Sequence, residues 1–132
     1  MANVLTSTIR IRVNTGGDEP VIFILRRPSA DKVQRFLKGR TETKRNKLVN
    51  RAYEARVEFI DGLLVDVEGV QYESKNGDHK PLTASVDLAD VHEAVRQDAG
   101  SWKDLIPVNW KSSAAMFFED TDDAEEGAGK NS

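Results

Sequence analysis

The chain has 132 residues, of which 39% are hydrophobic and 31% charged, and it carries a formal net charge of -3. This length suits one domain with a single core. The absence of cysteine excludes disulfides, thiolate zinc sites and cysteine nucleophiles. No run approaches the roughly 18 apolar residues of a membrane span, and the first residues lack the pattern of a secretory signal. We therefore expect a soluble, cytoplasmic protein with one domain, residues 1–119.

Residues 4–27 predict a β-hairpin. Residues 4–14 alternate between apolar and polar side chains, as a half-buried strand does. Residues 15–20 contain two glycines and an aspartate, which favour a reversal, and residues 21–27 are apolar enough for a more buried strand. The two strands should therefore pair.

Two helices are expected next. Pro28 ends the second strand, and Ser29 is a candidate N-cap for a short helix that stops at Gly39. From about Thr41 the sequence favours a longer helix, because apolar residues between 48 and 64 recur at spacings of three and four. Gly62 disfavours a helix interior, so this helix should end near it and residues 63–70 should run extended.

The last third of the chain predicts a small hairpin and two more helices. Asn76-Gly77 marks the turn of the hairpin, and Pro81 places its return strand at an edge or in a loop. Residues 86–100 predict one helix capped by Asp87, and residues 107–120 predict another. Residues 120–132 have nothing to bury and predict a disordered acidic tail. The expected class is α+β, an N-terminal β-hairpin packed on a mainly helical domain.

No catalytic or metal motif stands out. His79 and His92 are isolated from other ligands or nucleophiles, so surface positions are the simpler interpretation. Asp87, Asp90 and Glu93 would share a helix face and offer oxygens to a hard cation, but calcium needs six or more, and capping explains them more simply. We expect no enzyme activity, no cofactor and no metal.

The charge is distributed unevenly. Between Arg26 and Arg56 there are eleven bases and three acids, whereas six acids and one base follow from Glu119 to the end. Four of the bases would fall in the first half of the long helix, the positive end of its dipole, where bases are unfavourable. We therefore expect something anionic opposite them. These bases are Lys44, Arg45, Lys47 and Arg51.

Three anionic groups are candidates: nucleic acid, an acidic protein partner, and the chain's own tail. Nucleic acid is disfavoured, because no aromatic residue for base stacking lies between Lys38 and Asn50 and the sequence pI is about 5.4. A second candidate surface is aromatic. Trp102, Trp110, Phe117 and Phe118 fall within 17 residues and suit an apolar partner, core packing of the last helix being the alternative.

Three segments in order resemble the tail assembly chaperones of long-tailed bacteriophages and prophages. They are "FILRRPSADKVQRF", "ARVEFIDGLLVDVEGV" and "LIPVNWKSSAAMFFED". Members of that family often carry an Arg-Arg-Pro turn after a strand and an Ile-Pro, Trp-Lys, Phe-Glu ending. The likeness covers about Val21 to Glu119 and rests on the order and spacing of these motifs.

The resemblance implies a non-catalytic protein of the bacterial host cytoplasm, absent from the mature virion. It would bind the tape measure protein, keep it soluble and help the tail tube protein to polymerise around it. It also implies a longer form made by frameshifting near the acidic end, and a homo-oligomer is expected. The alternatives are a structural virion component, such as a tail tube or head-tail connector subunit, and a small nucleic-acid-binding regulator acting through Lys44 to Arg51.

Overall fold

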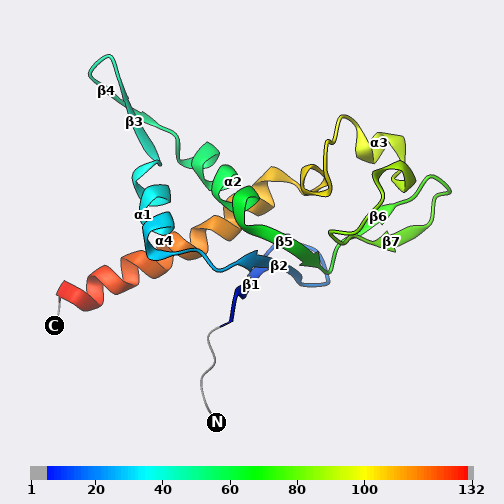
Figure 1. Ribbon diagram of the computed structural model, residues 1–132, viewed down its shortest axis with the longest axis horizontal. Coiled ribbons are helices and arrows are strands. Elements are labelled where there is room, and N and C mark those ends of the chain that lie inside the picture. Colours follow the sequence, from blue (N-terminus) through cyan, green and yellow to red (C-terminus); the bar gives the residue numbers. More distant parts are fainter. Residues whose placement is uncertain (1–5, 131–132) are drawn as a thin grey trace, which may run out of the picture.

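The structure is a computed structural model that describes the backbone of residues 6–130 and the side chains of residues 6–119. Strands and helices both contribute, which confirms the α+β class (Figure 1). The elements are β1 (Thr8–Val13), β2 (Val21–Arg26), α1 (Ala30–Lys38), β3 (Thr41–Lys44), β4 (Lys47–Asn50), α2 (Ala52–Leu63), β5 (Leu64–Glu68), β6 (Gln71–Glu73), β7 (His79–Pro81), the 3-10 helix η1 (Leu88–Asp90), α3 (Glu93–Arg96), the 3-10 helix η2 (Trp102–Leu105) and α4 (Val108–Lys130).

The main sheet has three antiparallel strands in the order β1-β2-β5. β1 pairs with β2 over its whole length, so the predicted N-terminal hairpin is confirmed. Along β1, Ile11 and Val13 are buried while Arg10 and Arg12 are exposed, which is the alternation that the sequence shows. β2 is the central strand, and its Phe23 is completely buried.

Helices α2 and α4 pack on each other and on the sheet (Figure 1). α2 buries Ile60 and Leu63, and α4 buries Ala114 and Ala115, whose small side chains allow the two helix backbones to approach closely. α1 adds Phe36 to the same core. Together these residues form one hydrophobic cluster under the sheet.

Residues 41–50 form a β-hairpin, so the predicted helix from Thr41 is wrong over this segment. β3 pairs with β4 from Thr41–Asn50 to Lys44–Lys47. Arg45 and Asn46 make the turn with φ of 49° and 64°, the left-handed pair that suits a two-residue hairpin and that asparagine tolerates well. The helical spacing of Leu48 with later residues is a coincidence, since its side chain is 74% exposed.

The helix predicted over residues 86–100 is also wrong in part, because the structure breaks it into η1 and α3. Asp87 caps η1, as expected, by accepting a hydrogen bond from the Ala89 N–H. Val91 is extended, forms an isolated β-bridge with Ser74 and is buried. This contact outweighs helix propensity, and His92 then starts α3 by accepting from the Ala94 N–H.

The remaining boundaries follow the sequence. Ser29 caps α1 through the Lys32 N–H (3.1 Å), and the helix stops at Gly39. α2 ends at Leu63, and the chain continues extended as β5, as Gly62 indicated. Asn76-Gly77 connects β6 and β7. The α4 backbone continues as a helix to Lys130, past the end predicted for this helix at residue 120. The side chains of the predicted tail, residues 120–132, lie outside the described part, as does the backbone of residues 131 and 132, so the disorder of the tail stays a prediction.

Gly69, which follows β5, provides a test of the close approach between this turn and the start of β2. It has φ of +82°, and an added Cβ would lie 2.1 Å from the Pro20 carbonyl oxygen. We expect Gly69→Ala to lower the free energy of unfolding by about 3 kcal/mol or more. Two costs add up, because alanine disfavours this φ and because the backbone must also move to relieve the clash with Pro20. Gly77→Ala is the control, because Gly77 has φ of +88° but open space around it, and it should cost only about 1 kcal/mol. Equal losses in urea unfolding would contradict this account.

Candidate functional site

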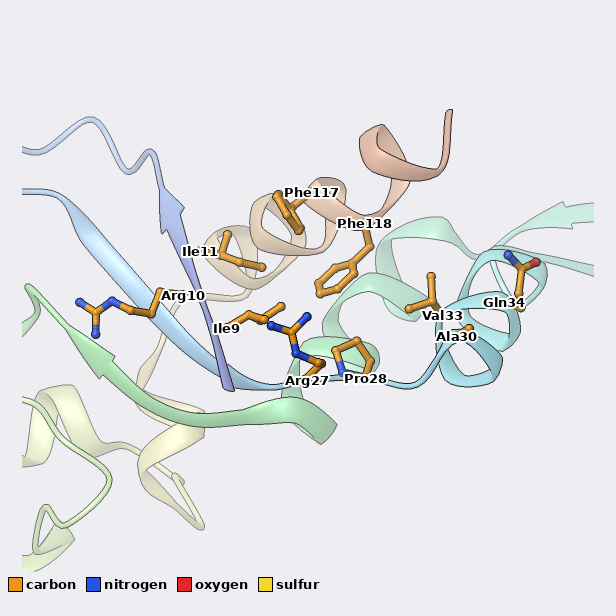
Figure 2. Close-up of a pocket in the computed structure, with 10 residues that line it drawn as sticks. All are labelled: Ile9, Arg10, Ile11, Arg27, Pro28, Ala30, Val33, Gln34, Phe117 and Phe118. Carbon is orange, nitrogen blue, oxygen red and sulfur yellow. The ribbon is translucent and has the colours of Figure 1, made fainter. Parts of the chain in front are cut away.

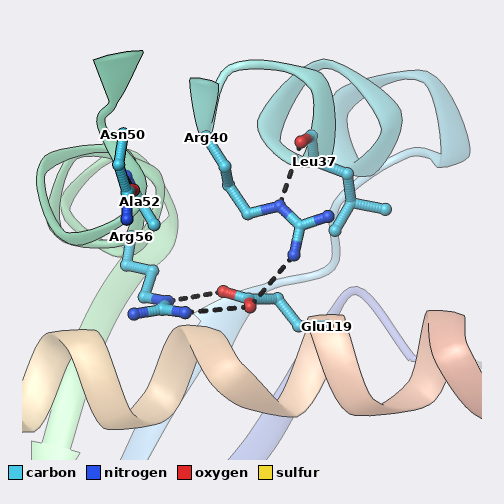
Figure 3. Close-up of polar contacts among 6 residues, drawn as sticks. All are labelled: Leu37, Arg40, Asn50, Ala52, Arg56 and Glu119. Atoms are coloured by element: carbon cyan, nitrogen blue, oxygen red, sulfur yellow. Dashed lines mark hydrogen bonds and ion pairs between the residues drawn. The ribbon is translucent and has the colours of Figure 1, made fainter. Parts of the chain in front are cut away.

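A buried carboxylate fixes α4 against the rest of the fold (Figure 3). Glu119 on α4 is 9% exposed and accepts two hydrogen bonds from Arg56 of α2, at 2.6 and 3.1 Å. Arg40, which follows α1, donates a third at 3.1 Å and also binds the Leu37 carbonyl oxygen. The Arg56 hydrogen bonds hold the pKa of Glu119 below its usual value, although burial opposes them. We call Glu119, Arg56 and Arg40 the latch.

A row of rings runs from the core beside the latch to the surface. Phe36 and Phe59 stack in parallel with centroids 4.3 Å apart. Phe59 meets Phe118 edge-on at 5.0 Å, and Phe118 meets Phe117 edge-on at 5.4 Å. Edge-to-face and stacked pairs of this kind have preferred geometries, so they orient the rings as well as burying them. The last ring, Phe117, is 49% exposed.

Phe117 and Phe118 form one wall of a groove of about 400 Å³ (Figure 2). The other walls come from β1, from the turn between β2 and α1, and from α1 itself. Most of the lining is apolar, and part of it belongs to the core cluster. The apolar lining residues are Ile9, Ile11, Pro28, Ala30, Val33, Phe117 and Phe118.

The local sequence explains why the groove stays open at its α1 end. Pro28 has no N–H to continue the β2 ladder, so the chain leaves the sheet there, and Ser29 starts α1 at once. The Arg27 N–H still bonds the Ser7 carbonyl oxygen (2.8 Å), which anchors the turn to the start of β1. The turn therefore lies opposite α4 with Pro28 facing the groove.

Two arginines, Arg10 and Arg27, lie at the rim of the groove, and they differ in their partners within the fold. Arg10 forms a forked ion pair with Glu68 of β5, and its side chain points away from the groove in Figure 2. Arg27 donates from Nε to the Thr6 carbonyl oxygen (2.8 Å), and among the described residues it has no ion pair. Figure 2 shows its guanidinium beside Ile9, so a ligand in the groove would meet one uncompensated positive charge.

The aromatic residues singled out in the sequence are separated by the structure. Phe117 and Phe118 line the groove, whereas Trp102 and Trp110 are partly buried against the core and do not line it. The core packing considered for this cluster thus describes Phe118, which is buried, and Trp102 and Trp110, which are partly buried, while Phe117 presents a large apolar surface outward.

The basic residues singled out in the sequence lie on the β3–β4 hairpin and at its base. Lys44, Arg45 and Lys47 are exposed at the tip, which stands out from the body in Figure 1. Arg51 is different, because Glu54 lies 3.1 Å from it and Glu42 and Glu58 lie 3.7 Å away. The helix-dipole argument fails for Lys44, Arg45 and Lys47, because they lie in a hairpin. Arg51 does stand at the N-cap of α2, and these three glutamates surround it there. An anionic partner for the three tip bases stays a prediction from their exposure.

The sequence patterns predicted neither the latch nor the groove residues contributed by β1 and α1. One signal was present: Arg56 falls on the apolar stripe of α2, where a charge is expected to be paired. Its partner Glu119 appeared as the first acid of the acidic end. The groove walls are far apart in the chain, so no spacing rule brings Ile9, Val33 and Phe117 together.

The acids and histidines considered for a metal have other contacts. Asp90 accepts hydrogen bonds from Lys80 (3.0 Å) and Tyr72 (2.8 Å). Both hydrogen bonds lower the pKa of Asp90, and the one from Lys80 has the larger effect. His79 is exposed, and His92 caps α3. Within the described residues, no group of three or more such side chains is placed to hold a metal ion.

No helix in the described part of the chain combines the length and apolar character that crossing a membrane requires. Comparisons of the chain with protein-family models, with curated proteins and with solved structures return no match.

The latch predicts a specific loss of stability. Glu119→Gln removes the charged acceptor of Arg56 and Arg40 in a nearly buried position, and we expect the free energy of unfolding to fall by about 2 to 3 kcal/mol. Glu68→Gln is the matched control, since Glu68 also forms a forked pair with an arginine but on the surface. A clearly smaller loss is expected there. Equal losses in chemical denaturation would refute the distinction.

The same carboxylate predicts a pH dependence. The folded pKa of Glu119 lies below the reference value of 4.5, so the folded state binds fewer protons than the unfolded state in that range. The contribution of the Glu119 carboxylate to the free energy of unfolding is therefore complete above about pH 4.5, and it is lost as the pH falls through the lowered pKa. The difference in unfolding free energy between wild type and Glu119→Gln should shrink from pH 6 to about pH 3. A difference that stays constant would contradict the assignment.

Proposed function

We propose that the protein is a non-catalytic tail assembly chaperone of a long-tailed bacteriophage or prophage. In this proposal it binds the tape measure protein in the bacterial cytoplasm, keeps it soluble and promotes tail tube assembly without remaining in the mature virion. The observation that carries the proposal is the apolar groove with the half-exposed Phe117 on its wall.

The chemistry of the groove suits an amphipathic helix. Such a helix binds by placing apolar side chains at spacings of three and four into a hydrophobic groove, with aromatic residues as anchors. The lining supplies Ile9, Val33 and Phe117 for apolar contact, and Arg27 supplies one positive charge for an acidic residue beside the apolar stripe. A tape measure protein is a long helical chain, so it offers many segments of this kind.

Two of the motifs behind the family resemblance lie at this groove. Arg27 and Pro28 belong to the Arg-Arg-Pro turn and line one side. Phe118 belongs to the Phe-Glu ending and lines the other, while the adjacent Glu119 holds α4 in place. Their meeting at one groove supports a shared role for two motifs that are about 90 residues apart.

The proposal extends to further forms and partners. The tail tube protein would polymerise around the tape measure chain that the groove holds, and a longer frameshifted form of this chain would diverge near the acidic segment. A subunit of the tail tube or head-tail connector is the alternative, and it differs in where the protein ends up. Stoichiometric presence of the chain in purified virions would favour that alternative and refute the chaperone.

The groove gives a test by mutation. Phe117→Ala should weaken binding of the tape measure protein by about tenfold or more, as loss of an aromatic anchor does, and should lower its soluble yield on co-expression. Val95→Ala is the control, because Val95 is 41% exposed on α3 and does not line the groove. Binding is measured by titration of a purified tape measure segment, with unfolding curves to check folding. Equal binding by both variants would place the partner elsewhere.

A further inference from the structure

The β3–β4 hairpin has the features of a binding arm. Within residues 6–130, β3 and β4 pair only with each other, and in Figure 1 they stand out from the body. The tip carries Lys44, Arg45 and Lys47, all exposed. Among the described residues, Arg45 and Lys47 have no ion pair, and Lys44 reaches only Glu42 at 3.9 Å. The tip therefore presents a positive charge that the described residues do not neutralise.

Apolar surface accompanies this charge. Leu48 is 74% exposed, and Val49 beside it is partly exposed. Leu48 also borders a hollow of about 440 Å³ between the hairpin and α2, together with Leu37 and Ala52. A surface that combines bases with an open aliphatic patch suits a polypeptide ligand, which offers both carboxylates and side-chain carbon.

The sequence contains a segment of opposite charge. Five acids lie between Asp120 and Glu126, directly after the latch residue Glu119. Met116, one turn before Glu119 on α4, is 42% exposed. Its side chain could therefore make an apolar contact with Leu48 of a second copy. We propose that the β3–β4 hairpin of one copy of the chain binds the acidic segment 120–126 of a second copy.

The direction of α4 favours a second copy over the chain's own segment. The latch fixes Glu119 at the base of the hairpin, because Arg40 directly precedes β3. From there the α4 backbone continues as a helix to Lys130, and Figure 1 shows it leaving the body in a different direction from the hairpin. The acidic segment thus leads away from its own hairpin. Since each copy has both halves of the contact, two copies can satisfy both at once.

Charge balance favours this partner over nucleic acid. Three bases at the tip supply few phosphate contacts compared with the roughly 6 to 10 of many DNA-binding proteins. The net charge of -3 opposes approach of a polyanion, whereas it does not prevent local contact between complementary patches.

Charge reversal tests the proposal on the full-length protein. Sedimentation equilibrium should show self-association of the wild type that weakens as the salt concentration rises from about 50 to about 500 mM. The variant K44E/R45E/K47E should associate at least tenfold more weakly, and so should D122K/D123K/E126K. An equimolar mixture of the two variants should regain wild-type association, because each interface in the mixed pair again joins opposite charges. This rescue excludes misfolding as the cause of the loss.

The control is R12E/K32E/K75E, which changes the net charge equally at exposed bases outside the hairpin and should associate like wild type. A wild type that stays monomeric at low salt would overturn the proposal, as would a mixture of the two variants that fails to associate. Loss of duplex DNA or RNA binding in K44E/R45E/K47E with unchanged self-association would also overturn it and assign the hairpin to nucleic acid. The proposal does not depend on the chaperone function, which the tape measure titration tests separately.

Discussion

The architecture depends on how charges are buried between α2 and α4. Glu119 and Lys111 both lie on the face of α4 that meets α2, eight residues apart, and Lys111 is only 2% exposed. Lys111 Nζ lies 2.8 Å from Asp61 Oδ1, an ion pair without good hydrogen-bond geometry, while Glu119 is held by the forked bonds of Arg56. Sliding α4 by one turn would leave buried charges without partners, which costs far more than repacking apolar side chains. The two pairs therefore set both the register and the direction of the helix.

That register positions both surfaces for which a binding role is proposed. Ala115 and Phe118 face inward between the two charged residues, and Phe117, one position before Phe118, lies at the groove with its side chain half-exposed. The same carboxylate binds Arg40, one residue before β3, and so anchors the hairpin where it leaves the body. A substitution of Glu119 is thus expected to affect both the groove and the hairpin, although Glu119 lines neither the groove nor the hollow beside the hairpin.

Local signals predicted much of the fold, and they failed where two signals competed. Alternation along β1, the Ser29 cap and the Asn76-Gly77 turn each need only neighbouring residues, and each is confirmed. At residues 41–51 helical spacing competed with the turn chemistry of Arg45-Asn46, and the turn prevailed. At Val91 a contact with Ser74, 17 positions earlier in the chain, decided the backbone conformation. The groove required the packing of β1, α1 and α4, which no periodicity contains.

The two proposed contacts differ in their physical character, and this difference gives them separate controls. The groove is mainly apolar, and Arg27 is the one lining cation without an ion pair to the described residues, so binding there would rest on burial of carbon surface and respond weakly to salt. The proposed attraction between the hairpin tip and the acidic segment acts through charges, and salt at 0.1 M largely screens exposed charges that are more than about 10 Å apart. A helical client held in the groove leaves the hairpin charges unchanged, so self-association and client binding can occur on one molecule. If both proposals hold, charge at the tip would set how many copies bind one long client together, and the groove would set how tightly each copy binds, because linked sites bind an extended chain more strongly than single ones.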